Sequence, residues 1–88
     1  MERPFHLSVL TSEKSIFDGQ AVSVVLPGEE GYLGVLSDHA PLASLLKPGN
    51  ILIKDATGQQ KVLKSNGAGL LEISENSITV ILNEVTIA

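Results

Sequence analysis

The chain contains no cysteine and no tryptophan, and its only aromatic side chains are two phenylalanines and one tyrosine. The absence of cysteine excludes a disulfide framework, a thiolate metal site and a cysteine nucleophile. Single-stranded nucleic acids are bound by basic grooves in which aromatic rings stack on the bases. Three rings in 88 residues disfavour a surface of that kind.

Positive charge is also scarce, since six Lys and Arg residues stand against ten Asp and Glu, for a formal net charge of −4. This balance opposes binding to phosphate backbones and to anionic lipid faces. No apolar run approaches the roughly 18–20 residues that cross a bilayer, and the first residues lack the pattern of a signal peptide. We therefore expect no nucleic-acid partner and no direct insertion into lipid, so that any membrane association goes through another protein.

What the chain does have is apolar residues at alternate positions. Period-two runs occupy residues 5–9, 22–26 and 78–82, and shorter β-branched runs occupy 51–53, 61–64, 70–73 and 85–87. Asp-Gly, Pro-Gly and Asn-Gly pairs separate many of these runs and are typical of turns. Hydrophobic residues make up 43% of the chain and charged residues 18%, which fits one packed domain over residues 1–88. We predict an all-β fold, a flattened antiparallel β-sandwich or barrel of about 8–10 short strands.

Two segments between these runs are predicted to be irregular. Residues 41–47 have the only helix-like composition, but Pro48-Gly49 would end a helix after about two turns, so we interpret them as an ordered connection. Residues 28–34 are rich in glycine and are interpreted as a tight turn between strands.

Several large apolar residues fall at positions that alternation assigns to solvent. One explanation is a β-bulge or strand end that turns the side chain inward, and the other is an outer apolar patch covered by a partner. Both remain open for Leu10, Val25, Leu52, Leu63, Leu70 and Ile81.

Catalytic chemistry finds little support in the residues. His6 alternates with Phe5 and Leu7 and is expected on the outer face of a strand. Ser37-Asp38-His39 holds the residue types of a serine triad, but sequence neighbours rarely converge in relay order, so we interpret it as a turn. The two histidines and the scattered carboxylates show no metal-ligand spacing. The glycine-rich segment lacks the lysine and hydroxyl of a phosphate loop. We therefore expect no catalytic residue, no metal and no cofactor.

One stretch of the sequence is distinctive. Residues 31–49 read GYLGVLSDHAPLASLLKPG, in which a glycine-bracketed turn precedes His-Ala-Pro and, at a fixed distance, Lys-Pro-Gly. This pattern resembles the signature of ATP synthase epsilon subunits. Residues 5–9, 17–19, 69–73 and 78–80 are similar to the family's opening strand, first turn and late strands, so the likeness covers nearly the whole chain. The structural motif that the resemblance identifies consists of Gly34, Ala40, Pro41, Lys47, Pro48 and Gly49.

The resemblance implies a non-catalytic central-stalk subunit of a proton-translocating F-type ATP synthase, held between the gamma subunit and the membrane c-ring. Such a subunit couples ring rotation to gamma for ATP synthesis. It is peripheral on the cytoplasmic face of the bacterial inner membrane through the complex. Most family members continue into two C-terminal helices that carry an ATP-sensing motif and can inhibit the motor. Residues 1–88 contain no counterpart of these helices, and on that basis we expect no helix-mediated inhibition.

The resemblance also implies two sets of contact residues. The c-ring contact is expected at Glu29, Glu30, Gly31 and Tyr32. The gamma-subunit contact is expected at Thr11, Ser37, Asp38, His39 and Ser44. A rival hypothesis is a small ligand- or carbohydrate-binding sandwich, which requires a concave site lined by aromatic rings. A third is a domain cut from a longer chain.

Overall fold

The computed structural model describes residues 3–37 and 39–87, and it contains nine strands and no helix in these ranges. The prediction of an all-β fold is confirmed. None of the described segments is a helix capable of crossing a membrane. The strands are β1 (Phe5–Leu10), β2 (Ser15–Gly28), β3 (Gly31–Val35), β4 (Leu42–Leu46), β5 (Gly49–Asp55), β6 (Gln60–Ser65), β7 (Gly69–Ser74), β8 (Ser77–Leu82) and β9 (Val85–Ile87).

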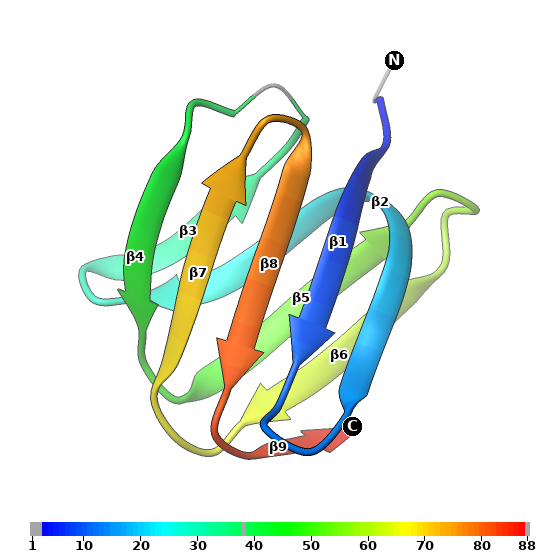
Figure 1. Cartoon of the computed structure of the whole chain (residues 1–88). Helices are drawn as coiled ribbons and strands as arrows, with labels where there is room; N and C mark the ends of the chain where they lie inside the picture. The colour runs from blue at the N-terminus through cyan, green and yellow to red at the C-terminus, as the bar shows by residue number, and fades with distance from the viewer. Residues whose placement is uncertain (1–2, 38, 88) are drawn as a thin grey trace.

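The strands form two layers that share β2 (Figure 1). The first half of β2 pairs with β1, which continues through β8 and β7 to β4. The second half of β2 pairs with β3 and β5, and β6 and β9 follow β5. The register with β5 shifts between Ala21 and Ser23, near the middle of β2. An irregularity of this kind bends a strand and increases its twist, which lets β2 pass from one layer to the other.

One strand pair departs from the antiparallel arrangement that the sequence predicted. β1 pairs with β8 in parallel, from His6 opposite Ser77 to Leu10 opposite Ile81. These strands are far apart in sequence, so no hairpin fixes their relative direction. The other strand pairs in the described ranges are antiparallel.

A single apolar core lies between the layers and takes side chains from β1 to β8. Its largest fully buried members are Phe5, Leu7, Leu26, Ile51, Ile53, Leu71, Ile78 and Leu82. The sequence left the orientation of Leu63 open, and the structure turns this residue inward, with only 3% of it exposed. Leu63 lies opposite Ile51, so its side chain shares the inner face of the sandwich and that of Val62 points outward.

Two strands were missed in the sequence. Residues 42–46, interpreted as an ordered connection, form β4 and pair along their whole length with β7. Residues 31–34, the second part of the segment interpreted as a tight turn, belong with Val35 to β3, which pairs with the end of β2. Leucine, alanine and glycine have weak strand preference, so cross-strand pairing rather than local propensity decides these segments.

Candidate functional site

A hairpin tip between β2 and β3 brings together the four residues predicted to contact the c-ring. Gly28 lies opposite Gly31, which leaves Glu29 and Glu30 as a two-residue loop with both carboxylates exposed. Gly31 has a φ of 131°, a backbone conformation that favours glycine at this turn. Tyr32 follows on β3 and is 58% exposed. The tip therefore presents two negative charges beside one amphipathic ring.

The Lys-Pro-Gly motif and the residue that follows it form hydrogen bonds with the base of this hairpin. The N–H of Lys47 donates to the carbonyl oxygen of Pro27 at 2.8 Å, next to the hairpin. The N–H of Asn50 donates to the Tyr32 hydroxyl at 3.3 Å. A Cβ at Gly49 would lie 3.0 Å from that hydroxyl oxygen and 3.0 Å from the Cβ of Pro27. The motif thus has a structural role, since glycine permits the close approach of Tyr32.

The residues predicted to contact gamma do not gather at one place. Thr11 lies in the β1–β2 turn, where its Oγ1 accepts the N–H groups of Glu13 and Lys14 at 3.3 Å each. Ser37 and His39 instead border the β7–β8 turn, beside Phe5 at the opposite end of β1. The predicted contact residues therefore span the length of the first layer.

The remaining members of the predicted sets have local roles or fall outside the described residues. Asp38, and with it part of the Ser37-Asp38-His39 turn, lies outside the described residues. The Nδ1–H of His39 donates to the carbonyl oxygen of Ala40 at 2.8 Å. Ser44 lies on β4 opposite the buried Leu71, which places it on the inner side of the sheet at its edge. Gly34, on β3, has open space where a Cβ would stand.

A row of aliphatic side chains crosses the outer face of the first layer. Leu45 on β4 is opposite Leu70 on β7, Leu70 is opposite Ile81 on β8, and Ile81 is opposite Leu10 on β1. Leu45, Leu70 and Ile81 are 57%, 40% and 46% exposed, and Leu10 is half-buried. We call these four residues the apolar row. Alternation identified three of them, and the strand register adds Leu45 and shows that the four are contiguous.

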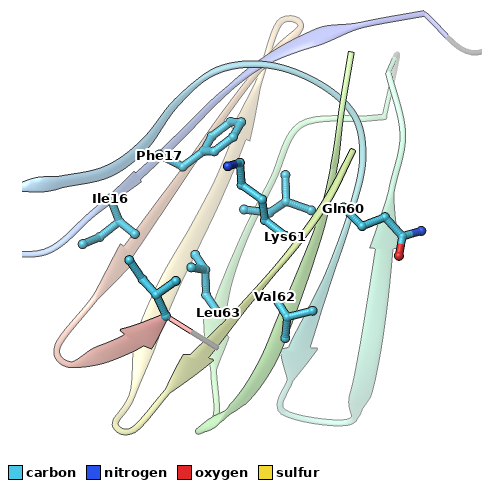
Figure 2. Close-up of a pocket in the computed structure, with 8 residues that line it drawn as sticks. Ile16, Phe17, Gln60, Lys61, Val62 and Leu63 are labelled. Carbon is cyan, nitrogen blue, oxygen red and sulfur yellow. The ribbon is translucent and has the colours of Figure 1, made fainter. Parts of the chain in front are cut away.

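A groove opens where the two layers do not close against each other, between the start of β2 and the β6–β9 pair (Figure 2). We call it the seam groove; its volume is about 580 Å³. Ile53, Leu63 and Ile87 are apolar residues on its inner side, and Lys61 and Gln60 add polar groups. The full lining consists of Ile16, Phe17, Ile53, Gln60, Lys61, Val62, Leu63 and Ile87.

The histidine that lies on the outer face of β1, as predicted, does not form a catalytic relay. His6 Nε2 is 2.8 Å from Asp18 Oδ1 and 3.2 Å from Ser8 Oγ. A relay requires the carboxylate and the hydroxyl on different ring nitrogens, whereas both contact the same one here. Among residues 3–37 and 39–87, no group of three or more potential metal ligands was found.

The β5–β6 turn is organised by one carboxylate. Asp55 Oδ1 accepts the hydroxyl of Thr57 at 2.6 Å, the N–H of Thr57 at 2.9 Å and the N–H of Gln59 at 3.0 Å. The hydroxyl of Thr57, and then these N–H groups and the charge of Lys61, lower the pKa of Asp55 below its ordinary value of 3.8. Because the group is accessible to water and its bonds are local, the turn is a structural feature rather than an active site.

Residues 4–88 match the family described as the ATP synthase delta/epsilon chain, beta-sandwich domain. The ATP synthase epsilon chain of Verminephrobacter eiseniae is 45% identical over 76 residues, which cover 86% of this chain and 54% of the relative. The epsilon chain of Dichelobacter nodosus is 33% identical over 84 residues, or 96% of this chain and 58% of the relative. The chain thus spans about half the length of the relatives it matches.

A solved structure has the same fold. A chain of the Euglena gracilis mitochondrial ATP synthase, in a structure of OSCP, F1 and the c-ring, superposes with a TM-score of 0.88 over 96% of this chain and 53% of that one. The sequence identity is 16%, so this likeness shows the fold alone.

Proposed function

Because the chain belongs to the ATP synthase delta/epsilon β-sandwich family, we propose that it is a non-catalytic rotor subunit of a proton-translocating F-type ATP synthase. Its role is to join the c-ring to the gamma subunit so that ring rotation drives ATP synthesis. The close packing of the sandwich makes it stiff, which suits a part that transmits torque. The enzyme complex would hold it on the cytoplasmic face of the bacterial inner membrane without lipid contact of its own.

The observation that carries this proposal is the apolar row. Four contiguous aliphatic side chains on an outer sheet face are unusual for a domain that works alone. A permanent subunit contact removes such side chains from water and stabilises the assembly. We assign the apolar row to the gamma subunit, with Thr11 next to Leu10 at one end.

The hairpin tip supports the second half of the proposal. Glu29 and Glu30 offer exposed carboxylates that can pair with basic residues in the polar loops of a c-ring, and Tyr32 adds a rigid contact beside them. Exposed ion pairs are screened by salt, whereas apolar contacts are not. Raising the salt concentration is therefore expected to release the ring before it releases gamma. Release of gamma first would contradict this division.

The experiment is a binding measurement between the purified chain and a gamma subunit. Ile81→Asp introduces a charge into the apolar row, and Leu52→Asp makes the same change on the outer face of the second layer, where Leu52 is 42% exposed. We expect Ile81→Asp to weaken gamma binding at least about tenfold, because it buries an unpaired charge. Leu52→Asp should bind as the native chain does. If only Leu52→Asp weakened binding, the assignment of the face would be wrong.

A second measurement tests the absence of inhibition expected for this 88-residue chain. It is added to an F-type catalytic sector depleted of its epsilon subunit, and ATP hydrolysis is followed. We expect no strong inhibition of the kind that ATP relieves. Such inhibition would show that the sandwich itself slows the motor.

A further inference from the structure

β3 is an edge strand of the second layer. It pairs with β2 on one side, from Gly31 to Val35, and no strand in the described ranges pairs with its other side. The positions outside the described ranges, 1–2, 38 and 88, adjoin residues at β1, at the β7–β8 turn and at β9, none of which pairs with β3. An open strand edge of this kind is a template for pairing with another chain.

The backbone groups of Tyr32 and Gly34 point to this open edge. Pro27, opposite Tyr32, has no N–H, and its carbonyl oxygen accepts the N–H of Lys47 on the side of β2 away from β3. Pro27 and Tyr32 are therefore a non-hydrogen-bonded pair. Such pairs alternate with hydrogen-bonded pairs along an antiparallel ladder, so Val25 and Gly34 form the next one. Tyr32 and Gly34 thus direct their N–H and C=O groups away from β2.

Gly34 is a glycine that the fold itself does not require. Its φ is not positive, and a Cβ built on it would meet no atom within 4 Å. Glycine inside a strand costs about 0.5–1 kcal/mol relative to alanine and often marks a place where another backbone approaches. The space over Gly34, beside the half-buried Val25, could hold a large side chain of an added strand. An apolar residue on the inner side of that strand would cover Leu33, which is only half-buried.

Charge selects among the segments that could occupy this edge. The loop before β3 carries Glu29 and Glu30, both exposed, and no ion pair joins either carboxylate to another group in the described ranges. The whole chain has a net charge of −4, so its field also favours a basic partner. An antiparallel strand beside β3 would end next to Gly31. Basic residues at its C-terminal end would therefore lie close to both carboxylates.

We propose that the open edge of β3 binds an extended segment of another protein by strand addition, with the basic C-terminal end of that segment beside Glu29 and Glu30. The inference rests on the proposed function for the partner, which is a polar loop of the c-ring. Hydrogen bonds from Tyr32 and Gly34 would fix the register of that loop on β3, which flexible ion pairs alone do not do.

The test uses the purified chain and blocked synthetic peptides of about eight residues, in which valine alternates with threonine before two C-terminal lysines. Affinity is measured by calorimetry, and the contacted residues are located by NMR shift perturbation. A second peptide is N-methylated at the residues that face β3, which removes backbone donors and keeps the side chains. We expect one-to-one binding with shifts at Tyr32 and Gly34, and at least about tenfold weaker binding of the methylated peptide, since several hydrogen bonds are lost.

A proline variant tests the backbone of β3 itself. Gly34→Pro removes an N–H from the open edge and leaves the hydrogen bonds between β2 and β3 in place, a substitution that edge strands tolerate. Gly34→Ala keeps the N–H and is the control, and thermal melts of both variants check folding. Gly34→Pro should bind the peptide about three- to tenfold more weakly than Gly34→Ala does. Equal binding by the two variants would contradict a hydrogen bond at this position.

The charge selection is tested with a third peptide in which glutamine replaces both lysines. The native chain should prefer the lysine peptide, and the double variant Glu29→Gln, Glu30→Gln should lose that preference. Glu75→Gln, an exposed change of equal sign in the β7–β8 turn, should keep it. A preference that survived in the double variant would show that the tip does not select the occupant. Purified c-ring should displace the lysine peptide from the native chain, and a peptide that stayed bound would exclude the ring as the partner.

Other results would overturn strand addition outright. Equal binding of the methylated and unmethylated peptides would show that the backbone of the ligand is not recognised. Failure of every peptide to bind at millimolar concentration would show that the edge accepts no strand. Dimerisation of the native chain through residues 31–35, seen by sedimentation and NMR, would make a second copy the occupant. If the peptides failed while Ile81→Asp still weakened gamma binding, this inference would fall and the proposed function would stand.

Discussion

The Tyr32 hydroxyl accepts the backbone N–H of Asn50 at 3.3 Å, which joins the β2–β3 hairpin to the start of β5. Tyr32 is one of the residues that the family resemblance assigns to the c-ring, and Asn50 directly follows its Lys-Pro-Gly motif. The hairpin tip and the Lys-Pro-Gly motif, which the resemblance treats separately, are therefore one structural unit. A substitution in the Lys-Pro-Gly motif is therefore expected to alter the position of Tyr32 at the hairpin tip, although the two segments are distant in sequence.

Gly49→Ala tests this unit. The added Cβ would lie 3.0 Å from both the Tyr32 hydroxyl oxygen and the Pro27 Cβ, so something must move. We expect a loss of about 1–3 kcal/mol in the free energy of unfolding, the usual cost of overpacking, measured by urea denaturation. Gly34→Ala is the control, since its Cβ would meet open space, and it should change stability by less than about 1 kcal/mol. Equal effects at both glycines would contradict the close approach.

Neighbouring leucines on β7 test the two faces of the first layer. Leu71 is fully buried and Leu70 is 40% exposed, so the same substitution reaches the core at one and the apolar row at the other. Leu71→Ala should cost about 2–5 kcal/mol in the free energy of unfolding of the isolated chain. Leu70→Ala should cost less than about 1 kcal/mol, because its partner is absent from that measurement. A large loss at Leu70 would show that the apolar row serves the fold rather than an interface.

The Asp55 turn makes a prediction about pH. The pKa of Asp55 is lower in the folded chain than its ordinary value of 3.8, so the unfolded chain binds the proton more tightly. The stability that the carboxylate contributes is present above pH 3.8 and is lost as the pH falls through the lower, folded value. Asp55→Asn should therefore lower the urea midpoint at pH 7, and the difference from the native chain should shrink as the pH falls below 3.8 and through the lower, folded pKa of Asp55.

A second variant controls for the change in net charge that Asp55→Asn causes. Glu75→Gln, in the β7–β8 turn, changes the net charge by the same amount at a site without the three hydrogen bonds of Asp55. Its effect on the midpoint at pH 7 should be smaller. A difference between native chain and Asp55→Asn that stayed constant down to pH 2 would show that the ionised carboxylate is not what stabilises the turn.

The His6–Asp18 pair should contribute little to stability. Its atoms are 2.8 Å apart, but the side chains are 46% and 62% exposed. Exposed pairs are worth about 0–1 kcal/mol, because water screens the charges and two side chains lose freedom. A double-mutant cycle with His6→Gln and Asp18→Asn should give a coupling energy below about 1 kcal/mol at pH 6. A larger coupling would indicate that the outer face of β1 is less accessible to water than the structure shows.

Much of the fold was predictable because most strands bury one face, and alternation then appears directly in the sequence. β4 and β3 were missed because Leu-Ala-Ser-Leu-Leu and a glycine-rich run have no such alternation, and their pairing with β7 and β2 decides their structure. The orientation of Leu63 was left open because Val62 and Leu63 are adjacent apolar residues, and only pairing with β5 shows which one faces inward. The seam groove left no local signal, since its walls come from β2, β5, β6 and β9.

The family motif was recognisable, but its physical role was not. Nothing in the sequence shows that Gly49 leaves space for the Tyr32 hydroxyl. Nor does it show that the Thr11 hydroxyl accepts hydrogen bonds from the backbone of the β1–β2 turn. Contacts of this kind depend on three-dimensional proximity between segments. Likewise, the apolar row needed the register of four strands before Leu45 could join Leu10, Leu70 and Ile81.

The 14-residue strand β2 has a mechanical consequence. It pairs with β1 at its beginning and with β3 and β5 towards its end, where the Glu29–Glu30 loop begins (Figure 1). A sideways force on that loop therefore passes into both layers through one unbroken peptide backbone and its ladders of hydrogen bonds. Because β2 belongs to both layers, we expect them to rotate together as one rigid body. Little of an applied torque would then be lost to sliding of one layer over the other.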